Sequence, residues 1–327
     1  MITAAHREPG YYRVRWNGRP WVVARYDVSA SGVGYWSLPP GDVDVPSADF
    51  PHEIDDSPVP QLHQSVSGAM MVSVRKLAPS ELPYSRPHQA TFDKLVSGRV
   101  PHENDFYGLK LLDKPGTVFV DIGGNIGNSA LSVHFVCPDW RVVSIEPNPS
   151  LRPYLESAGA LIKSEGGKFE YHCIGFADRA GELPFFIPEI DDWMVIGESS
   201  ILLDHFDDQV VSRRLSSYSS HGRWSLIETS VQVVRFDDWV SDKPHITSSE
   251  SVFVKIDVEG AECLVMSGMT EFIRAKRPSF MIENSDNNEI PRHLSDYGYV
   301  AYDYIESANE FVPDRKRGGL NKFYFPN

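Results

Sequence analysis

The chain has 327 residues, of which 41% are hydrophobic and 23% are charged, a composition typical of one large globular core with or without a small added domain. Its formal charge is −14, and no basic run stands out beyond residues 315–317, which argues against a nucleic-acid partner. Cys137, Cys173 and Cys263 are too few and too widely spaced for a disulfide framework or a zinc site.

The N-terminal sequence MITAAHREPGYYRVRW lacks the apolar core of a secretory signal. No apolar run in the chain approaches the ~20 residues that a membrane-spanning helix needs. We therefore expect a cytoplasmic protein that has no membrane partner.

Residues 1–85 differ from the rest of the chain in composition and in hydrophobic pattern. YYRVRWNGRPWVVARYD alternates in strand fashion around Asn17-Gly18, a pattern typical of a β-hairpin. Gly, Ser, Pro and Asp are then frequent over residues 29–60. These features predict a small N-terminal module, β-rich or partly irregular, whose role the sequence does not reveal. The module is a candidate surface for homo-oligomer contacts.

From residue 86 onward, strands and helices alternate. Helices are predicted at residues 88–98, 104–116, 126–135 and 289–298, and two more begin at residues 149 and 260. Strands are predicted at residues 117–120, 141–145, 169–174, 252–256, 279–283, 299–304 and 322–325. Asn148 is expected to cap the helix that begins at Pro149. The alternation predicts an α/β domain over residues 86–327, with seven strands in a doubly wound, mainly parallel sheet that has helices on both faces.

Residues 189–230 interrupt the alternation of strands and helices. Long segments of this kind in α/β folds often lie at a functional edge. We interpret them as an insertion with two alternative roles, either a lid or substrate-recognition segment, or a surface excursion that has no part in the site. His205 and His221 within it are candidate general bases, although a lone histidine in a polar loop is usually only solvated.

The stretch VFVDIGGNIG, residues 118–127, ends a predicted buried strand with an acid and three glycines. Gly123 and Gly127 permit a tight turn and a close approach of backbone to ligand, at the strand end where α/β sheets bind ligands. Glu146 ends the next strand, 19 residues after Gly127, which is the usual spacing of an acid that binds adenosine ribose hydroxyls. The alternatives are tight strand–helix packing for the glycines and a solvated carboxylate for Glu146.

Two classes of cofactor use such a turn. A nicotinamide cofactor needs G-x-G-x-x-G, but Ile122 stands where the first glycine is required. Asp121 would also repel a pyrophosphate, whereas it could hold the ammonium of an amino acid directly or through water. The turn therefore favours S-adenosylmethionine, and an NAD-dependent oxidoreductase is the less favoured alternative.

A second group of acids follows the strand predicted at residues 252–256. SVFVKIDVEGAEC places Lys255, Asp257, Glu259 and Glu262 at a strand end and a helix start. Glu259 and Glu262 could simply favour the positive end of a helix dipole. Asp257 is more informative, because a carboxylate after a buried apolar strand must find a partner.

Four motifs, VFVDIGGNIGNSA, VVSIEPNP, CIGFADRAGEL and VFVKIDVEGAECLVMSG, resemble the FkbM-type family of S-adenosylmethionine-dependent methyltransferases. The resemblance extends from about Glu103 to the C-terminus, implies the class I Rossmann-like fold, and does not cover the N-terminal module. Gly124 stands where the family commonly has alanine, which we interpret as a conservative replacement. The resemblance implies that the methionine half of the cofactor lies against Asp121, Gly123, Asn125 and Gly127, the ribose against Glu146, and the adenine against Phe176, Ala177 and Asp178.

The same resemblance implies methyl transfer, and a hydroxyl acceptor must lose its proton in that reaction. Asp257, Glu259 and Glu283 are the candidate bases. Asp257 with Glu283 and Asn284 also resembles the magnesium site of catechol-type O-methyltransferases, although these groups could instead bind one another. We therefore expect an O-methyltransferase with carboxylate or Mg²⁺ assistance.

The expected acceptor is a small molecule, either a secondary metabolite, as in antibiotic biosynthesis, or a sugar. An N-methyltransferase is the nearest alternative, because an amine needs less base assistance and the acids could recognise a cation. A binding protein that keeps the cofactor pocket without turnover is a third alternative, and the acids at residues 121, 146 and 257 argue against it.

Overall fold

The computed structural model describes residues 10–15, 22–28, 34–37, 53–55, 63–64, 71–82, 87–190, 193–219, 222–283, 289–314 and 321–327. The chain divides into two compact units, one of Met1–Val74 with Phe206–Ser225 and the other of Arg75–His205 with Leu226–Asn327. The domain boundary that the sequence suggests after residue 85 stays a prediction.

The first unit contains an antiparallel sheet in the order β3-β2-β1-β4. Its strands are β1 (Gly10–Arg15), β2 (Val22–Val28), β3 (Gly34–Ser37) and β4 (Glu53–Asp55). Val14 lies opposite Val22, so β1 and β2 pair as the predicted hairpin requires, while the turn at Asn17-Gly18 lies outside the described residues. The unit also contains β5 (His63–Gln64), β6 (Met71–Val72) and α4 (Gln209–Tyr218).

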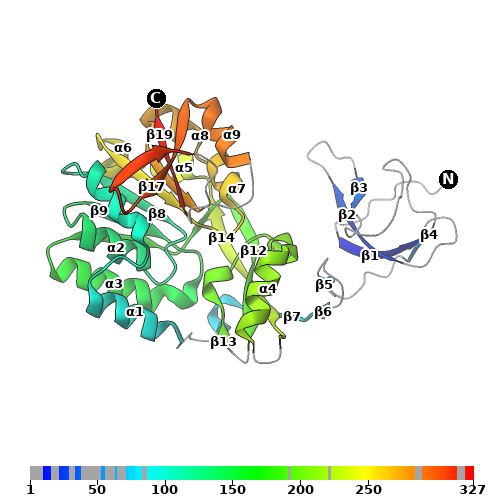
Figure 1. The fold of residues 1–327 in the computed structure, drawn as a ribbon. Coiled ribbons are helices and arrows are strands. Elements are labelled where there is room, and N and C mark those ends of the chain that lie inside the picture. The colour runs from blue at the N-terminus through cyan, green and yellow to red at the C-terminus, as the bar shows by residue number, and fades with distance from the viewer. Residues whose placement is uncertain are drawn as a thin grey trace. The chain divides into compact units, whose positions relative to one another are not determined.

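The second unit is built on a sheet with the strand order β10-β9-β8-β15-β16-β19-β17-β18. Figure 1 labels four of these strands, β8, β9, β17 and β19. Neighbours among the first five strands are parallel, and the last three alternate in direction. The strands are β8 (Val118–Ile122), β9 (Arg141–Ile145), β10 (Lys168–His172), β15 (Val252–Ile256), β16 (Ser279–Glu283), β17 (Tyr299–Ile305), β18 (Glu310–Pro313) and β19 (Asn321–Pro326).

The α/β prediction is confirmed, but the prediction of seven strands is wrong, because the sheet is mixed and has eight. The extra strand is β18, a short edge strand with only half-buried or exposed residues. A strand of this kind carries no continuous apolar run, so its sequence gives little signal.

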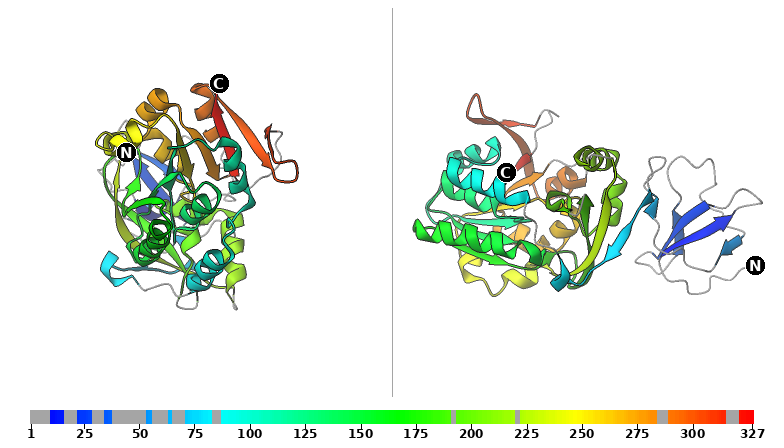
Figure 2. Two further views of the ribbon diagram at one scale, coloured as in Figure 1. Left: turned by 90° about the vertical axis from the view of Figure 1, so that its left-hand side faces the viewer. Right: turned by 90° about the horizontal axis from the view of Figure 1, so that it is seen from below.

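Helices cover both faces of the sheet (Figure 2). One face packs against α1 (Pro87–Gly98), η2 (Asn104–Leu112), α2 (Asn128–Val136) and α3 (Arg152–Ser164). The other packs against α5 (Phe236–Val240), α6 (Pro244–Thr247), α7 (Glu262–Ser267), α8 (Thr270–Lys276) and α9 (Glu289–Asp296). In β8, Phe119 belongs to the first core and Val118 and Val120 to the second, which explains why the strand is apolar throughout its first three residues.

A smaller sheet has the order β11-β14-β12-β13, with β7 (Val74–Lys76) also paired to β14. Its strands are β11 (Gly175–Phe176), β12 (Gly181–Ile190), β13 (Trp193–Met194) and β14 (Ser225–Val234). The predicted insertion, residues 189–230, is therefore not a plain loop, because it starts at the end of β12 and ends inside β14. Between them it also forms η4 (Ile196–Glu198) and η5 (Leu203–Asp207).

Two local features complete the second unit. The predicted cap is confirmed, because Asn148 Oδ1 accepts a 3.0 Å hydrogen bond from Ser150 N at the start of η3 (Pro149–Leu151). A further short helix, η1 (Pro79–Glu81), precedes α1. None of the helices in the described ranges combines the length and the apolar character that crossing a bilayer requires.

Candidate active site

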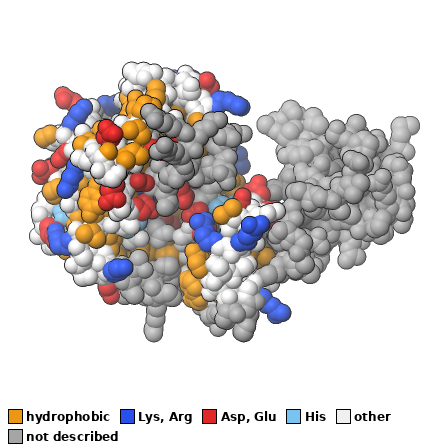
Figure 3. All heavy atoms as spheres, in the orientation of Figure 1, with side chains coloured by type: hydrophobic (Ala, Val, Ile, Leu, Met, Phe, Trp, Pro, Cys, Tyr) orange, Lys and Arg blue, Asp and Glu red, His pale blue; other side chains and the backbone are white. Residues whose placement is uncertain are grey.

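A cavity of about 270 Å³ lies at the carboxyl ends of the parallel strands β8, β9, β15 and β16. Its wall includes the turn after β8, Glu146 after β9, Asp257 and Glu259 after β15, and Glu283 at the end of β16. Residues of the insertion around η4 also line it. Ligands bind at this edge of α/β sheets. Figure 3 shows one face of the molecule, with several acidic side chains near the middle of the part that is drawn in colour.

The turn after β8 is held tightly between its two neighbouring strands. The backbone N–H groups of Gly123 and Gly124 both donate to the carbonyl of Ile145, at 2.9 Å each. Gly123 has a φ of 88°, and a Cβ on it would lie 1.7 Å from the carbonyl oxygen of Asp257. Only glycine fits a left-handed position that touches another backbone, so the fold itself requires glycine at residue 123.

Asn125 ties this turn to the insertion. Its Nδ2 donates to the carbonyl oxygen of Ile196 in η4 at 3.3 Å, and its Oδ1 accepts from Ile126 N at 2.8 Å. Its own N–H donates to Glu146. The side chain therefore links the turn to η4, and both line the cavity.

Glu146 is a buried carboxylate with both oxygens oriented by backbone. Oε1 accepts from Asn148 N at 2.8 Å and Oε2 accepts from Asn125 N at 2.9 Å. Burial raises the pKa of Glu146 to about 7, although these two N–H donors oppose the shift. Each carboxylate oxygen can still accept a further hydrogen bond, so the group is preorganised to receive two donors from a ligand in the cavity.

Asp121 lies beneath the turn and not on the cavity wall. It is fully buried, its Oδ2 accepts a 3.0 Å hydrogen bond from Ser144 Oγ, and its Oδ1 has no hydrogen-bond partner among the described residues. Burial raises the pKa of Asp121 to about 6, against the opposing field of Lys255. A direct contact with a ligand ammonium, one of the two routes expected from the sequence, does not fit this position.

Gly124 is more than a conservative replacement. A Cβ on it would lie 2.0 Å from Ser144 Oγ and 3.3 Å from Asp121 Oδ2. The hydroxyl that donates to Asp121 therefore occupies the room that an alanine at position 124 would need.

Three titratable groups, Lys255, Asp257 and Glu283, meet near the ends of β15 and β16. Lys255 is 1% exposed, and its Nζ donates to Asp257 Oδ2 at 2.6 Å. Burial lowers the pKa of Lys255, but Asp257 and Asp121 outweigh it and raise that pKa above its ordinary value. Burial likewise raises the pKa of Asp257, but Lys255 outweighs it and holds that pKa below its usual range. Burial, followed by Asp257, raises the pKa of Glu283 to about 8.

The two carboxyl groups share a hydrogen bond, and the opposite pKa shifts favour the proton of this pair on Glu283 over Asp257. One carboxylate oxygen of each of Asp257, Glu259 and Glu283 lies within 4.8 Å of the others. The structure thus brings the three predicted bases together on one wall of the cavity.

Of the residues expected to contact the adenine, only one lines the cavity. Phe176 lines the cavity with a buried ring in edge contact with Phe236 and Trp239, whereas Ala177 is buried and lies off the wall. Asp178 is also off the wall, with a side chain that is 39% exposed and 3.4 Å from Arg179.

Glu262 accepts from Gly260 N at 3.1 Å, as a residue at a helix start does. His205 lies near Glu259, whereas Asn284 and His221 lie outside the described residues.

Two residues on the wall were missed by the sequence analysis. His102 Nδ1 lies 2.8 Å from Ser132 Oγ, and burial with the nearby Lys255 lowers the pKa of His102 to about 3. Glu103 Oε2 accepts from Asn321 Nδ2 at 2.9 Å. Both precede η2, far in sequence from the glycine turn, and no motif in PHENDF signals that they reach this cavity.

Comparison with known proteins gives one family and several relatives. Residues 121–301 match the family described as Methyltransferase FkbM domain. The chain is 24% identical over 209 residues to methyltransferase sdnD of Sordaria araneosa, which covers 60% of this chain and 77% of that protein. It is 27% identical over 177 residues to 2-O-methyltransferase NoeI of Sinorhizobium fredii, with 52% and 64% covered.

A third relative is AMB antimetabolite synthetase AmbE of Pseudomonas aeruginosa, 26% identical over 189 residues, with 54% of this chain but only 9% of AmbE covered. Among solved structures, methyltransferase FkbM of Methylobacillus flagellatus aligns with a TM-score of 0.39 and 16% identity, covering 73% of this chain and 59% of that one.

Proposed function

Because the chain belongs to the FkbM methyltransferase family, we propose that it transfers a methyl group from S-adenosylmethionine to a hydroxyl group of a small molecule. The observation that carries the proposal is the placement of two differently tuned carboxylates on one cavity. Glu146 is held ready for hydrogen bonds by backbone N–H groups, and Asp257 is kept ionised by Lys255.

The residues of the cavity fit an adenosyl cofactor. The two oxygens of Glu146 suit the two ribose hydroxyls, and Phe176 offers an apolar surface nearby for the base. The acids on the wall suit the positive charge of a sulfonium. The orphaned Oδ1 of Asp121, buried beneath the turn, is available to a water that bridges it to the cofactor's ammonium.

S-adenosylmethionine supplies an electrophilic methyl group with a good leaving group. The chain's part is to align the acceptor and take up its proton. As the acceptor oxygen bonds to the methyl carbon and the carbon–sulfur bond breaks, the hydroxyl proton goes to the carboxylate of Asp257. Lys255 keeps that carboxylate ionised, and Glu283 orients it through their hydrogen bond.

The Mg²⁺ site expected at Asp257, Glu283 and Asn284 is not part of this proposal. The ammonium of Lys255 already lies 2.6 Å from Asp257, where it would repel a dication.

The choice of a hydroxyl acceptor rests on the relatives. NoeI is named a 2-O-methyltransferase, which supports O-methylation, and AmbE is named an antimetabolite synthetase, which supports a role in secondary metabolism. N-methylation is the second candidate, because the carboxylates on the wall would also attract an ammonium.

The test is to incubate the purified chain with methyl-labelled S-adenosylmethionine and pairs of small sugars that differ only in a hydroxyl or an amino group. We expect label on the hydroxyl-bearing member of a pair, identified by NMR of the product. Label on the amine alone would replace the proposal with the N-methyltransferase alternative, and cofactor binding without label transfer to any acceptor of either kind would contradict catalysis.

Glu146 leads to a prediction about pH. Ribose hydroxyls donate to the ionised carboxylate, so cofactor binding requires Glu146 to lose its proton, and its pKa is raised by burial to about 7. Affinity for S-adenosylhomocysteine is therefore expected to be about tenfold weaker at pH 6 than at pH 8, measured by titration calorimetry. Glu146→Gln should bind weakly at both values. Glu310→Gln, at an exposed position of β18, is the matched control and should keep the pH dependence. The same pH dependence in Glu146→Gln would refute the assignment.

A further inference from the structure

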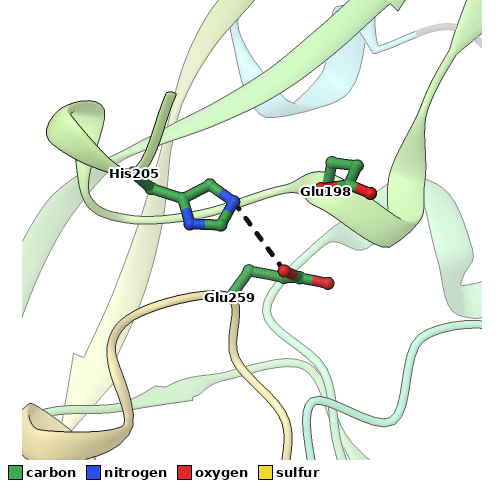
Figure 4. Close-up of side chains that lie close together, drawn as sticks. All are labelled: Glu198, His205 and Glu259. Carbon is green, nitrogen blue, oxygen red and sulfur yellow. Dashed lines mark ion pairs between the residues drawn. The ribbon is translucent and has the colours of Figure 1, made fainter. Parts of the chain in front are cut away.

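A second group of side chains borders the cavity and shares Glu259 with the cavity wall. Glu198 from η4, His205 from η5 and Glu259 from the loop between β15 and α7 point toward one another (Figure 4). One ligand atom from each lies within 4.8 Å of the others, and His205 Nε2 is 3.7 Å from Glu259 Oε2.

The spacing of these atoms is that of ligands around an ion. At 3.7 Å, the contact between His205 and Glu259 is longer than a hydrogen bond, which spans about 2.7–3.2 Å. Metal–nitrogen and metal–oxygen bonds of about 2.0–2.2 Å place neighbouring ligand atoms roughly 3.0–3.5 Å apart. A small inward movement of side chains would bring the three groups onto a common metal.

The environment also favours a cation. Glu198 is 5% exposed, and the side chains of His205 and Glu259 are 10% and 18% exposed. A dication bound between these side chains would be attracted by two carboxylates in a site that is largely shielded from water.

The backbone positions the groups closely. Ser200 Oγ donates to the carbonyl of Glu259 at 2.7 Å, and a Cβ on Gly260 would lie 3.2 Å from His205 Nδ1. These contacts join the loop after β15 to the insertion at the point where the three side chains meet.

We propose that Glu198, His205 and Glu259 form a binding site for a divalent first-row transition metal such as Zn²⁺ or Mn²⁺. One imidazole nitrogen and two carboxylates suit these borderline ions better than Mg²⁺, which prefers oxygen ligands. The metal joins η4 and η5 of the insertion to the loop that carries Asp257 and Glu259, and so holds one wall of the cavity in place. The proton transfer proposed for Asp257 does not use this metal.

The experiment uses the full chain, stripped of metal with a chelator and then titrated with Zn²⁺ by calorimetry. We expect one equivalent to bind, and Glu198→Gln and His205→Gln to weaken binding by at least about tenfold. His245→Gln is the matched control, because His245 pairs with the single carboxylate of Glu170 at 2.6 Å and should leave affinity unchanged. Glu283→Gln tests the neighbouring cluster of Asp257, Glu259 and Glu283, and should also leave affinity unchanged.

A second readout guards against variants that fail to fold. Co²⁺ bound to the unmodified chain should give a visible absorption spectrum that Zn²⁺ abolishes by displacement, and circular dichroism should confirm that each variant is folded. The proposal is overturned if stoichiometric Zn²⁺ binding is absent, if folded His205→Gln and Glu198→Gln bind as tightly as the unmodified chain, or if only Glu283→Gln loses binding.

Discussion

Asp257→Asn is expected to lower kcat by about 10²–10⁴-fold, because the amide cannot accept the proton that the acceptor hydroxyl releases. Cofactor affinity should change much less, since the contacts proposed for the ribose are made by Glu146 on the neighbouring strand. The fold should persist, because the amide oxygen can still accept from Lys255 and the backbone N–H of residue 257 keeps its bond to the carbonyl of Ile122. The measurement pairs steady-state kinetics with calorimetric titration of S-adenosylhomocysteine.

The control for this variant is Asp139→Asn, which removes an exposed carboxylate from the turn between α2 and β9, away from the cavity wall. It should leave both kcat and affinity unchanged. If Asp257→Asn reduced affinity and kcat by the same factor, Asp257 would be a structural residue of the turn and not the proton acceptor.

Gly123→Ala is expected to have the largest effect on stability. The residue has a φ of 88°, which costs an alanine about 1–2 kcal/mol. The new methyl group would also lie 1.7 Å from the carbonyl oxygen of Asp257, so the turn or the end of β15 must move. We expect a fall in Tm well beyond the backbone cost, together with loss of S-adenosylhomocysteine binding, because the displaced turn carries Asn125 N–H away from Glu146.

Gly116→Ala separates the cost of the positive φ from the cost of the clash with Asp257. Gly116 also has a positive φ, 81°, but a Cβ on it would meet nothing within 4 Å. It should show the backbone cost alone and keep full cofactor affinity. Equal falls in Tm for the two variants would show that the close approach to Asp257 does not constrain residue 123.

The core of the fold was predictable because its strands are continuous apolar runs. β9, β15 and β16 have the bounds expected from the sequence, and each is buried along most of its length. The short strand β18 and the smaller sheet were not predicted, because pairing with distant segments makes strands of sequences that have little periodicity of their own.

The part of the candidate site that could be predicted consists of acids and glycines at the ends of apolar strands. The glycine turn, Glu146 and Asp257 lie together on the cavity as their positions at strand ends imply. The burial of Asp121 behind Gly124 and Ser144 could not be predicted, since it depends on how a side chain from β9 packs. His102, Glu103 and Glu198 reach the site or its border only through long-range folding.

A crystal structure of the chain with S-adenosylhomocysteine tests most directly whether this cavity is an adenosyl site. We expect both ribose hydroxyls within hydrogen-bond distance of the Glu146 carboxylate and the sulfur atom turned toward Asp257. A ligand bound elsewhere on the chain, or one in this cavity whose ribose leaves Glu146 untouched, would contradict it.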